Sequence, residues 1–332
     1  TEPWFGGKKP NALSFSFNHS VQRQVDFFNP GNFGQELGFF KITGATLGLA
    51  RRVTWPDDYF SISNSLQFQV YEFDQFGTSF GLSYPTGRSN SLTLNTTIAR
   101  NNIDNPIYPR FGSNVMLNVA MTPPYSSMND NLSPESPDEE KYKWLEYHKW
   151  MFDASIYTPL FGSNKLVASA RAHMGFLGSY GNRIGIIPLE RFVMGGDGMT
   201  FNNFALGQEI IGLRGYENQS ITPGRDTRGT ADPDPFGGIV YNKYVMELRF
   251  LVSPNPSATI FVLGFAEAGN NWGSYEEFNP YDLKKSAGVG ARIFMPAFGL
   301  LGVDWGYGFD PIPGQTRRSG PQFHFTIGQQ FR

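Results

Sequence analysis

The chain lacks cysteine altogether, and it also lacks an excess of charge of either sign. Without thiols, its 332 residues form no disulfide and carry no thiolate nucleophile or thiolate metal ligand. The 27 Lys and Arg residues are balanced by 29 Asp and Glu residues. This balance leaves no basic surplus for a phosphate backbone, so we expect no nucleic-acid partner.

Long apolar runs and catalytic signatures are missing as well. No run approaches the roughly 18–20 residues of a membrane-spanning helix, and the motifs of α/β-hydrolases, zinc proteases and P-loop proteins are absent. The four histidines lie far apart, and we interpret His19 and His324 as solvated side chains on strands. A membrane lipase with a dispersed Ser–His pair stays open as an alternative. The sequence predicts no enzyme, no cofactor and no metal site.

The chain is rich in aromatic residues and glycine and poor in charge. It contains 31 Phe, 15 Tyr and 38 Gly, and only 17% of its residues are charged. A soluble α/β enzyme usually has more charge and fewer aromatic residues. The composition therefore favours a β-rich protein with a large aromatic surface.

Strict alternation of apolar and polar residues is the clearest local pattern. Four segments show it: 13–18, 60–72, 91–98 and 322–331. In 60–72, Phe60, Ile62, Leu66, Phe68 and Val70 share one face, and Ser and Gln residues share the other. The polar face consists mainly of uncharged residues and has few Lys or Glu residues, whereas the polar face of a soluble β-sandwich usually has many. We therefore predict an all-β transmembrane antiparallel barrel, with a soluble all-β domain as the alternative.

The connections between the alternating segments divide into short and long ones that follow each other in strict order. The short ones, such as Trp55–Asp58 and 254–257, carry turn residues, and the long ones include 123–147 and 181–238. This order is typical of outer-membrane barrels, which have short periplasmic turns and long extracellular loops. Counting segments predicts about twelve strands, and the best helical pattern, 139–150, falls inside a long loop.

The longest connection, 181–238, is rich in apolar residues. A loop of this length is functional or disordered, and apolar content argues against disorder. We expect it to pack inside the barrel lumen. The apolar residues on which this expectation rests are Ile186, Ile187, Phe192, Val193, Met194, Phe201, Phe204, Ile210, Ile211, Leu213 and Tyr216.

Arg214 in this loop has two expected partners on the following strands. Alternation in 241–252 and 260–268 turns Glu247 and Glu267 toward the lumen from adjacent strands, where they need a cation. A guanidinium binds carboxylates through a fork of donors, so Arg214 fits that need. The alternative is that Arg214 is an ordinary exposed charge of the loop.

Four short motifs together resemble the Omp85 superfamily. They are Gly195-Gly196, Leu213-Arg214-Gly215-Tyr216, Glu247-Leu248-Arg249-Phe250 and Glu267-Ala268-Gly269. The resemblance runs through most of the chain and is most specific over 191–332. It implies that the loop folds into the lumen, that Leu213, Arg214, Gly215 and Tyr216 lock it there, and that Glu267 and Glu247 are the acidic partners.

The resemblance also implies parts that this sequence does not contain. Family barrels have sixteen strands preceded by periplasmic POTRA domains, and residues 1–10 resemble the turn before the fifth strand. We therefore expect 1–332 to be a single barrel domain that lacks its first four strands. Gly328 matches a glycine that lets the last strand bend at a lateral seam, and Phe331 lies at that seam although the chain ends in Phe331-Arg332 rather than in a bare aromatic residue.

The function implied by the resemblance is the folding and insertion of β-barrel proteins into the bacterial outer membrane. The implied partners are unfolded outer-membrane clients, accessory assembly lipoproteins, the POTRA domains and outer-membrane lipid. The alternative within the superfamily is a two-partner secretion pore that passes polypeptide through its lumen, and porins or receptor-type channels come third. Five POTRA repeats would favour assembly, and two would favour secretion.

Overall fold

Twelve alternating segments form twelve strands of one antiparallel sheet in the computed structural model, as predicted. The structure describes residues 1–2, 6, 11–25, 34–77, 82–198, 208–225 and 236–328. Neighbours in the sheet follow chain order, with β10 next to β7 across the longest connection. The strands are β1 (Asn11–Val25), β2 (Glu36–Val53), β3 (Phe60–Asp74), β4 (Gly87–Asn101), β5 (Gly112–Met121), β6 (His148–Pro159), β7 (Leu166–Gly178), β10 (Val240–Asn255), β11 (Ala258–Trp272), β12 (Lys284–Met295), β13 (Gly299–Pro311) and β14 (Arg318–Ile327).

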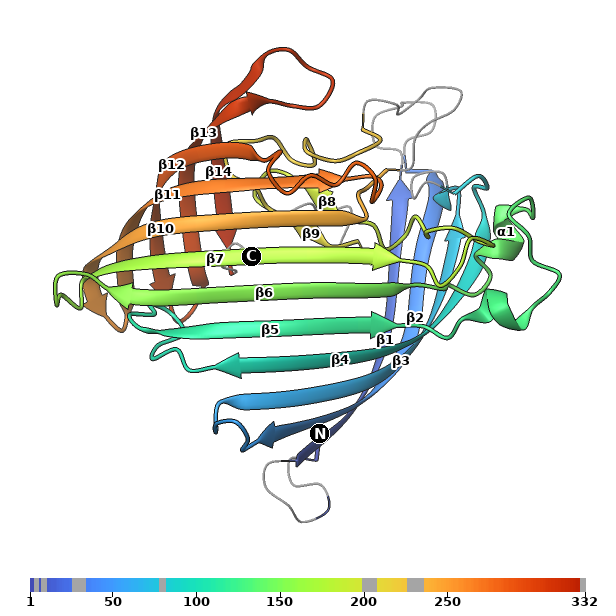
Figure 1. Ribbon diagram of the computed structural model, residues 1–332, viewed down its shortest axis with the longest axis horizontal. Coiled ribbons are helices and arrows are strands. Elements are labelled where there is room, and N and C mark those ends of the chain that lie inside the picture. Colours follow the sequence, from blue (N-terminus) through green and yellow to red (C-terminus); the bar gives the residue numbers. More distant parts are fainter. Residues whose placement is uncertain are drawn as a thin grey trace.

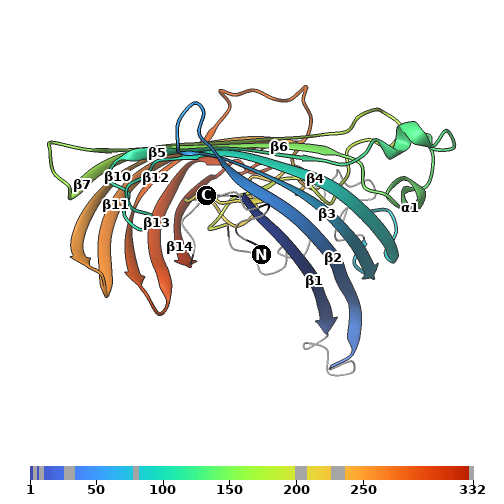
Figure 2. The same ribbon diagram turned by 90° about the horizontal axis from the view of Figure 1, so that it is seen from below.

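The sheet is curved into an arch with β1 and β14 as its two outer edges (Figure 2). Beyond β2, β1 pairs with Glu2, which exchanges two backbone hydrogen bonds with Leu13 of 2.7 and 2.9 Å. Within the described ranges, no pairing joins β1 to β14. The four preceding strands stay a prediction.

The two faces of the sheet differ as the alternation predicts. On β3, Leu66 and Phe68 are 48% and 41% exposed on the convex face, while Tyr71 and Phe73 on the concave face are buried. The convex face carries exposed apolar side chains on every long strand, which suits contact with lipid. No helix in the described ranges is long and apolar enough to cross a membrane.

The long connections gather at one end of the sheet around a buried aromatic and aliphatic core. This core joins residues of β2 and β3, including Phe40 and Phe73, to loop residues such as Leu145, Ile187 and Phe192. The concave face of β3 carries Ser and Gln residues in its middle. It is apolar at its loop end, because the loops cover it there.

The helix expected over 139–150 is wrong in extent. The loop contains a 3₁₀ turn (Tyr125–Met128) and a single helical turn, α1 (Asp138–Lys141; Figure 1). Extended pairing takes the rest: the backbone N–H of Leu145 donates to Asn90, that of Thr122 donates to Tyr147, and β6 begins at His148. Tertiary hydrogen bonding to neighbouring strands overrides the local helical pattern.

Candidate functional site

The long connection between β7 and β10 lies against the concave face of the sheet, inside the arch (Figure 2). Its two short strands, β8 (Val193–Met194) and β9 (Ile210–Ile211), pair in parallel with each other. Phe192 bridges to Gly238, and Gly196 bridges to Leu213. Leu213 and Met194 have no exposed surface, so the loop is packed and its tip is held in place. The expected loop residues Phe201 and Phe204 lie outside the described residues.

A buried ion pair joins the start of this loop to β6 of the sheet. Lys149 Nζ on β6 donates to Glu190 Oε2 at 3.1 Å, and both side chains are buried. Burial raises the pKa of the Glu190 carboxyl, and the nearby Lys149 ammonium offsets only part of that rise. This contact was not foreseen from the sequence.

The tip of the loop makes a tight backbone approach at Gly215. Its φ is +87°, a left-handed conformation that suits glycine. A Cβ at this position would lie 2.9 Å from the backbone nitrogen of Gly308 on β13. A Cβ at Gly308 would in turn lie 2.4 Å from the Gly215 carbonyl oxygen. Glycine is therefore required on both sides of the contact between loop and wall.

This approach brings Arg214 against three carboxylates. Its Nε donates to Glu267 Oε1 at 2.7 Å and its backbone N–H to Glu267 Oε2 at 2.9 Å. Its Nη2 donates to Glu247 Oε1 at 2.6 Å, and its Nη1 lies 3.3 Å from Asp304 Oδ1. The guanidinium has no exposed surface and stacks on Phe265, with 3.7 Å between its carbon and the ring centre. These contacts form a buried ion-pair network that joins the loop to strands β10, β11 and β13.

The electrostatics of the site favour the charged arginine. Burial alone would lower the pKa of the Arg214 guanidinium. The carboxylates of Glu267, Glu247 and Asp304 outweigh burial and raise that pKa above its usual value. Arg214 therefore stays charged, and the alternative of an ordinary exposed loop charge is wrong.

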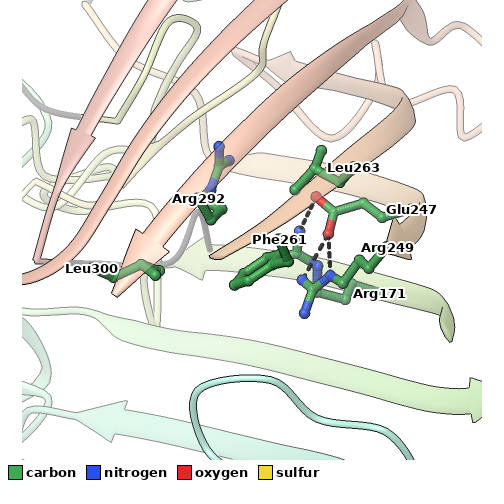
Figure 3. A pocket seen from close by; sticks show the side chains of 7 residues that line it. All are labelled: Arg171, Glu247, Arg249, Phe261, Leu263, Arg292 and Leu300. Atoms are coloured by element: carbon green, nitrogen blue, oxygen red, sulfur yellow. Dashed lines mark hydrogen bonds and ion pairs between the residues drawn. The ribbon is translucent and has the colours of Figure 1, made fainter. Parts of the chain in front are cut away.

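The carboxylates have further arginine partners on the wall. Glu247 Oε1 accepts from Arg171 on β7 at 2.8 Å, and Glu247 Oε2 accepts from Arg249 on the same strand at 2.6 and 2.8 Å (Figure 3). Asp304 Oδ2 accepts from Arg292 at 2.7 Å. Each carboxylate that meets the loop from β10 or β13 is thus also tied to an arginine of the sheet. No group of three or more metal-ligating side chains occurs in the described ranges.

The residues after Arg214 are anchored to the last strands of the sheet. The Gly215 N–H donates to His324 Nε2 at 2.9 Å, and the Ser319 hydroxyl donates to the Gly215 carbonyl at 2.8 Å. The Tyr216 hydroxyl donates to the carbonyl of Lys285 at 2.8 Å. The interpretation of His324 as a solvated side chain is wrong, because it is 5% exposed and accepts a backbone hydrogen bond from the loop. His19 is exposed and contacts Thr43.

Asp304 and the glycines of β13 are site residues that the sequence analysis missed. A signal for them is present, because Gly302, Asp304, Gly306 and Gly308 alternate with Val303, Trp305, Tyr307 and Phe309. The first set faces the concave side, where it leaves room for the loop backbone. Glycine alternating with aromatic residues is therefore a pattern that predicts a wall against which a loop can dock.

The expected seam residues are only partly described. β14 ends at Ile327, and residues 329–331 of the predicted strand lie outside the described residues. Gly328 follows with a φ of +75°, and its N–H donates to the Leu300 carbonyl at 2.7 Å. Phe331 lies outside the described residues. Its place at a seam stays a prediction.

Comparison with known proteins places this geometry in a family context. The model of the Omp85 superfamily domain matches residues 1–331. BamA from Haemophilus ducreyi lacking POTRA domains 1–3 is similar, with a TM-score of 0.66 and 17% identity over 98% of this chain and 60% of that chain. CdiB from Escherichia coli has a TM-score of 0.55 and 11% identity over 96% and 50% of the two chains. CdiB from Acinetobacter baumannii has 0.54 and 13% over 96% and 47%. The chain thus spans 47–60% of the length of these solved structures, and likeness at such identity shows the fold.

Proposed function

Because the chain belongs to the Omp85 superfamily, we propose that it folds and inserts β-barrel proteins into the bacterial outer membrane. The family's barrels are integral outer-membrane proteins, and the chain is one of them. The proposed partners are unfolded outer-membrane clients, accessory lipoproteins, POTRA domains and outer-membrane lipid. The proposal includes four strands before β1 and a lumen that holds residues 181–238.

One observation carries the proposal: the concave face is filled at its loop end by a buried core, and Arg214 holds the loop there through buried ion pairs. A client strand entering the arch along its axis would meet the buried core of the loops. A client strand approaching sideways would reach the N–H and C=O groups of β14 once the seam between the last strand and the first strand of the barrel had opened. This contrast supports a lateral route.

The proposed mechanism is β-augmentation without a covalent step. The edge of β14 offers backbone hydrogen bonds to a client strand, and successive client strands pair with each other until the new barrel separates. The buried ion-pair network at Arg214 keeps β10, β11 and β13 in fixed register beside that edge. Gly328 ends β14 in a conformation that favours glycine, which supports bending of the last strand there.

The second candidate is a two-partner secretion pore. The fold-level likeness to CdiB favours it, and so does the nature of the loop contacts, which are hydrogen bonds and ion pairs and can be released without breaking a covalent bond. In that case polypeptide would pass along the concave face after the loop had moved.

Site-specific photo-crosslinking distinguishes the two candidates. A photoreactive residue at Phe325 on β14, whose side chain is 59% exposed, is expected to capture client barrels during their assembly. The matched control is Ile156 on β6, which is 54% exposed on the convex face and distant in sheet order. A third position, Gln67 on the concave face of β3, reports passage along the lumen. Capture of a secreted polypeptide at Gln67 without client capture at Phe325 would replace assembly by secretion.

A further inference from the structure

A groove of about 600 Å³ lies on the convex face of the sheet, across β7 and β10–β14. Its volume is in the range of ligand-binding pockets. Strand pairing joins Leu248 to Gly264, Gly264 to Val289, Val289 to Trp305 and Trp305 to Phe323, so these lining residues form one row across the sheet. Gly264 and the neighbouring Ala291 have the smallest side chains of the lining and form the floor of the groove.

The floor depends on a glycine that no contact within the protein requires. A Cβ at Gly264 would lie 4.0 Å from its nearest neighbour, the carbonyl oxygen of Gly288, which is an ordinary contact. Every other glycine of β10–β14 has either a positive φ or a Cβ position at 3.0 Å or less from a neighbouring atom. Glycine weakens a strand relative to alanine, and a glycine inside a strand often marks a place where a ligand approaches the backbone.

The groove faces the membrane. The chain belongs to a family of integral outer-membrane barrels, and the exposed apolar side chains around the groove, such as Leu248, Val289 and Phe323, continue the lipid-facing surface. An acyl chain in the groove contacts side chains below it and on both sides, whereas a chain on a flat face contacts them on one side. The larger number of dispersion contacts favours the chain in the groove.

A lysine lies at the end of the groove that is next to the short turns. Lys165 directly precedes Leu166, which lines the groove, and it is the one charged residue in the turns 160–165, 254–257 and 296–298. Its carbonyl oxygen accepts hydrogen bonds of 2.8 Å from the Leu251 N–H and from the Tyr108 hydroxyl. The backbone of Lys165 is therefore held in place while the residue is exposed. A lysine at the membrane surface attracts the phosphate groups of lipids.

We propose that the groove binds one glycerophospholipid from the leaflet on the side of the short turns. One acyl chain lies over Gly264 and Ala291, and the phosphate lies beside the Lys165 ammonium. The chain also packs against Phe323 on β14, so the bound lipid contacts the strand that borders the proposed seam. This inference rests on the outer-membrane location of the barrel and holds for an assembly factor and a secretion pore alike.

Labelling with a photoreactive phospholipid tests the site. The full-length protein is placed in nanodiscs of phosphatidylethanolamine and phosphatidylglycerol, a small share of which carries a diazirine in one acyl chain. Adducts should concentrate on residues 258–272 and 284–295. They should be lost from these residues in Gly264→Leu, because the new side chain fills the groove and its Cβ has room.

The matched control for this labelling is Ala45→Leu. It adds the same side chain to the convex face of β2, where Ala45 pairs with the exposed Phe68, and it should leave the adducts unchanged. Uniform labelling of the convex face, or equal labelling over the groove in Gly264→Leu and the unaltered protein, would mean ordinary lipid contact only and would overturn the site.

Two further measurements test the headgroup and the occupant. Lys165→Gln should reduce labelling over the groove, whereas Lys143→Gln, which removes an exposed lysine of the connection 123–147, should not. Equal labelling in Lys165→Gln and Lys143→Gln would overturn the phosphate contact. A photoreactive residue at Val289, whose side chain is 58% exposed, should capture phospholipid. Capture of a client protein or of a second copy of this chain there, in place of lipid, would also overturn the proposal.

Discussion

The two halves of the concave face are built from different residues. On β1–β5 its middle is lined by side chains such as Ser16, Asn18, Ser91 and Thr93, and on β7 and β10–β14 it is lined by arginines, carboxylates and glycines. Ion pairs occur near the first half too, but they lie elsewhere. Arg100–Asp57 and Arg110–Asp104 are at short turns, and Lys41–Glu72 is on the convex face. A concave face that contacts only water needs uncharged polar side chains. The part of the face that holds the loop needs charged side chains to pair with Arg214, and glycines that let the loop backbone approach.

The glycines show the same contrast. Gly48 on β2 also faces the concave side, but the one tight contact of a Cβ there would be with the Ser14 hydroxyl, at 2.7 Å. A Cβ at Gly306 or Gly308 on β13 would meet the backbone of Gly215 at 2.8 or 2.4 Å. A serine side chain can rotate away and a docked backbone cannot. Glycine in the second half is therefore a requirement of loop docking.

The largest effect is expected from removing the charge of Arg214, which joins the loop to the second half of the concave face. Arg214→Ala leaves Glu247, Glu267 and Asp304 facing one another without the cation of the loop. Breaking a buried pair typically costs about 3–5 kcal/mol, and the cost falls toward the lower end because arginines of the wall still pair with Glu247 and Asp304. The barrel should fold, but protease should cut within residues 181–238 and client insertion should fall.

Three companion variants sharpen that result. Arg183→Ala removes a loop arginine whose side chain is 45% exposed and should change neither protease resistance nor insertion. Arg214→Lys should restore both only in part, because an ammonium cannot donate to separate carboxylates through a planar fork. The swap Arg214→Glu with Glu267→Arg tests the pairing itself. Normal client insertion in Arg214→Ala with a protease-resistant loop would contradict the proposed lock.

Much of this site follows from the amino-acid sequence, and the reason is the strict geometry of strands. Alternation fixes the face of every strand residue, so the inward direction of Glu247, Glu267 and Arg249 is predictable from sequence alone. The interpretation of His324 as solvated fails because alternation gives the direction of a side chain and says nothing of what covers that face. The partners of Arg214 beyond Glu247 and Glu267 depend on how deep the loop reaches across β13, which no local pattern determines.

The next effect in size concerns the glycines. Gly308→Ala should weaken loop docking by about 1–3 kcal/mol, the usual cost of overpacking, because its Cβ would overlap the Gly215 carbonyl oxygen. Gly48→Ala is the matched control on the other half and should be tolerated, since Ser14 can rotate. Loop proteolysis and the unfolding temperature of both variants measure the difference. Equal sensitivity of the two positions would remove the distinction between the two walls.

A smaller effect is expected at the acceptor for the loop backbone. His324→Leu leaves the buried Gly215 N–H without its acceptor, which typically costs about 1–3 kcal/mol, and relaxation of the loop should keep the loss near the lower end. Ser91→Ala, which removes a buried hydroxyl that contacts Thr93 at 2.9 Å in the first half, is the comparison. Hydrogen exchange at Gly215 should rise in His324→Leu alone. Unchanged exchange there would show that the histidine does not hold the loop.

The smallest effect is expected from the Arg110–Asp104 ion pair of the first half, at the short turn between β4 and β5. Burial raises the pKa of Asp104, but hydrogen bonds from the Arg110 and Phe111 N–H groups and from the Arg110 side chain outweigh it and lower that pKa below its usual value. A carboxyl with a lowered folded-state pKa contributes stability above its unfolded pKa, and that contribution is lost as pH falls through the folded value. Asp104→Asn should therefore destabilise the barrel slightly at pH 7, by at most about 1 kcal/mol since the Arg110 side chain is 40% exposed. The difference from the unaltered protein should disappear in strong acid, as measured by the unfolding temperature from pH 7 to pH values below the folded pKa. Loop proteolysis should stay normal throughout, and a change in it would mean that turn charges of the first half also reach the loop.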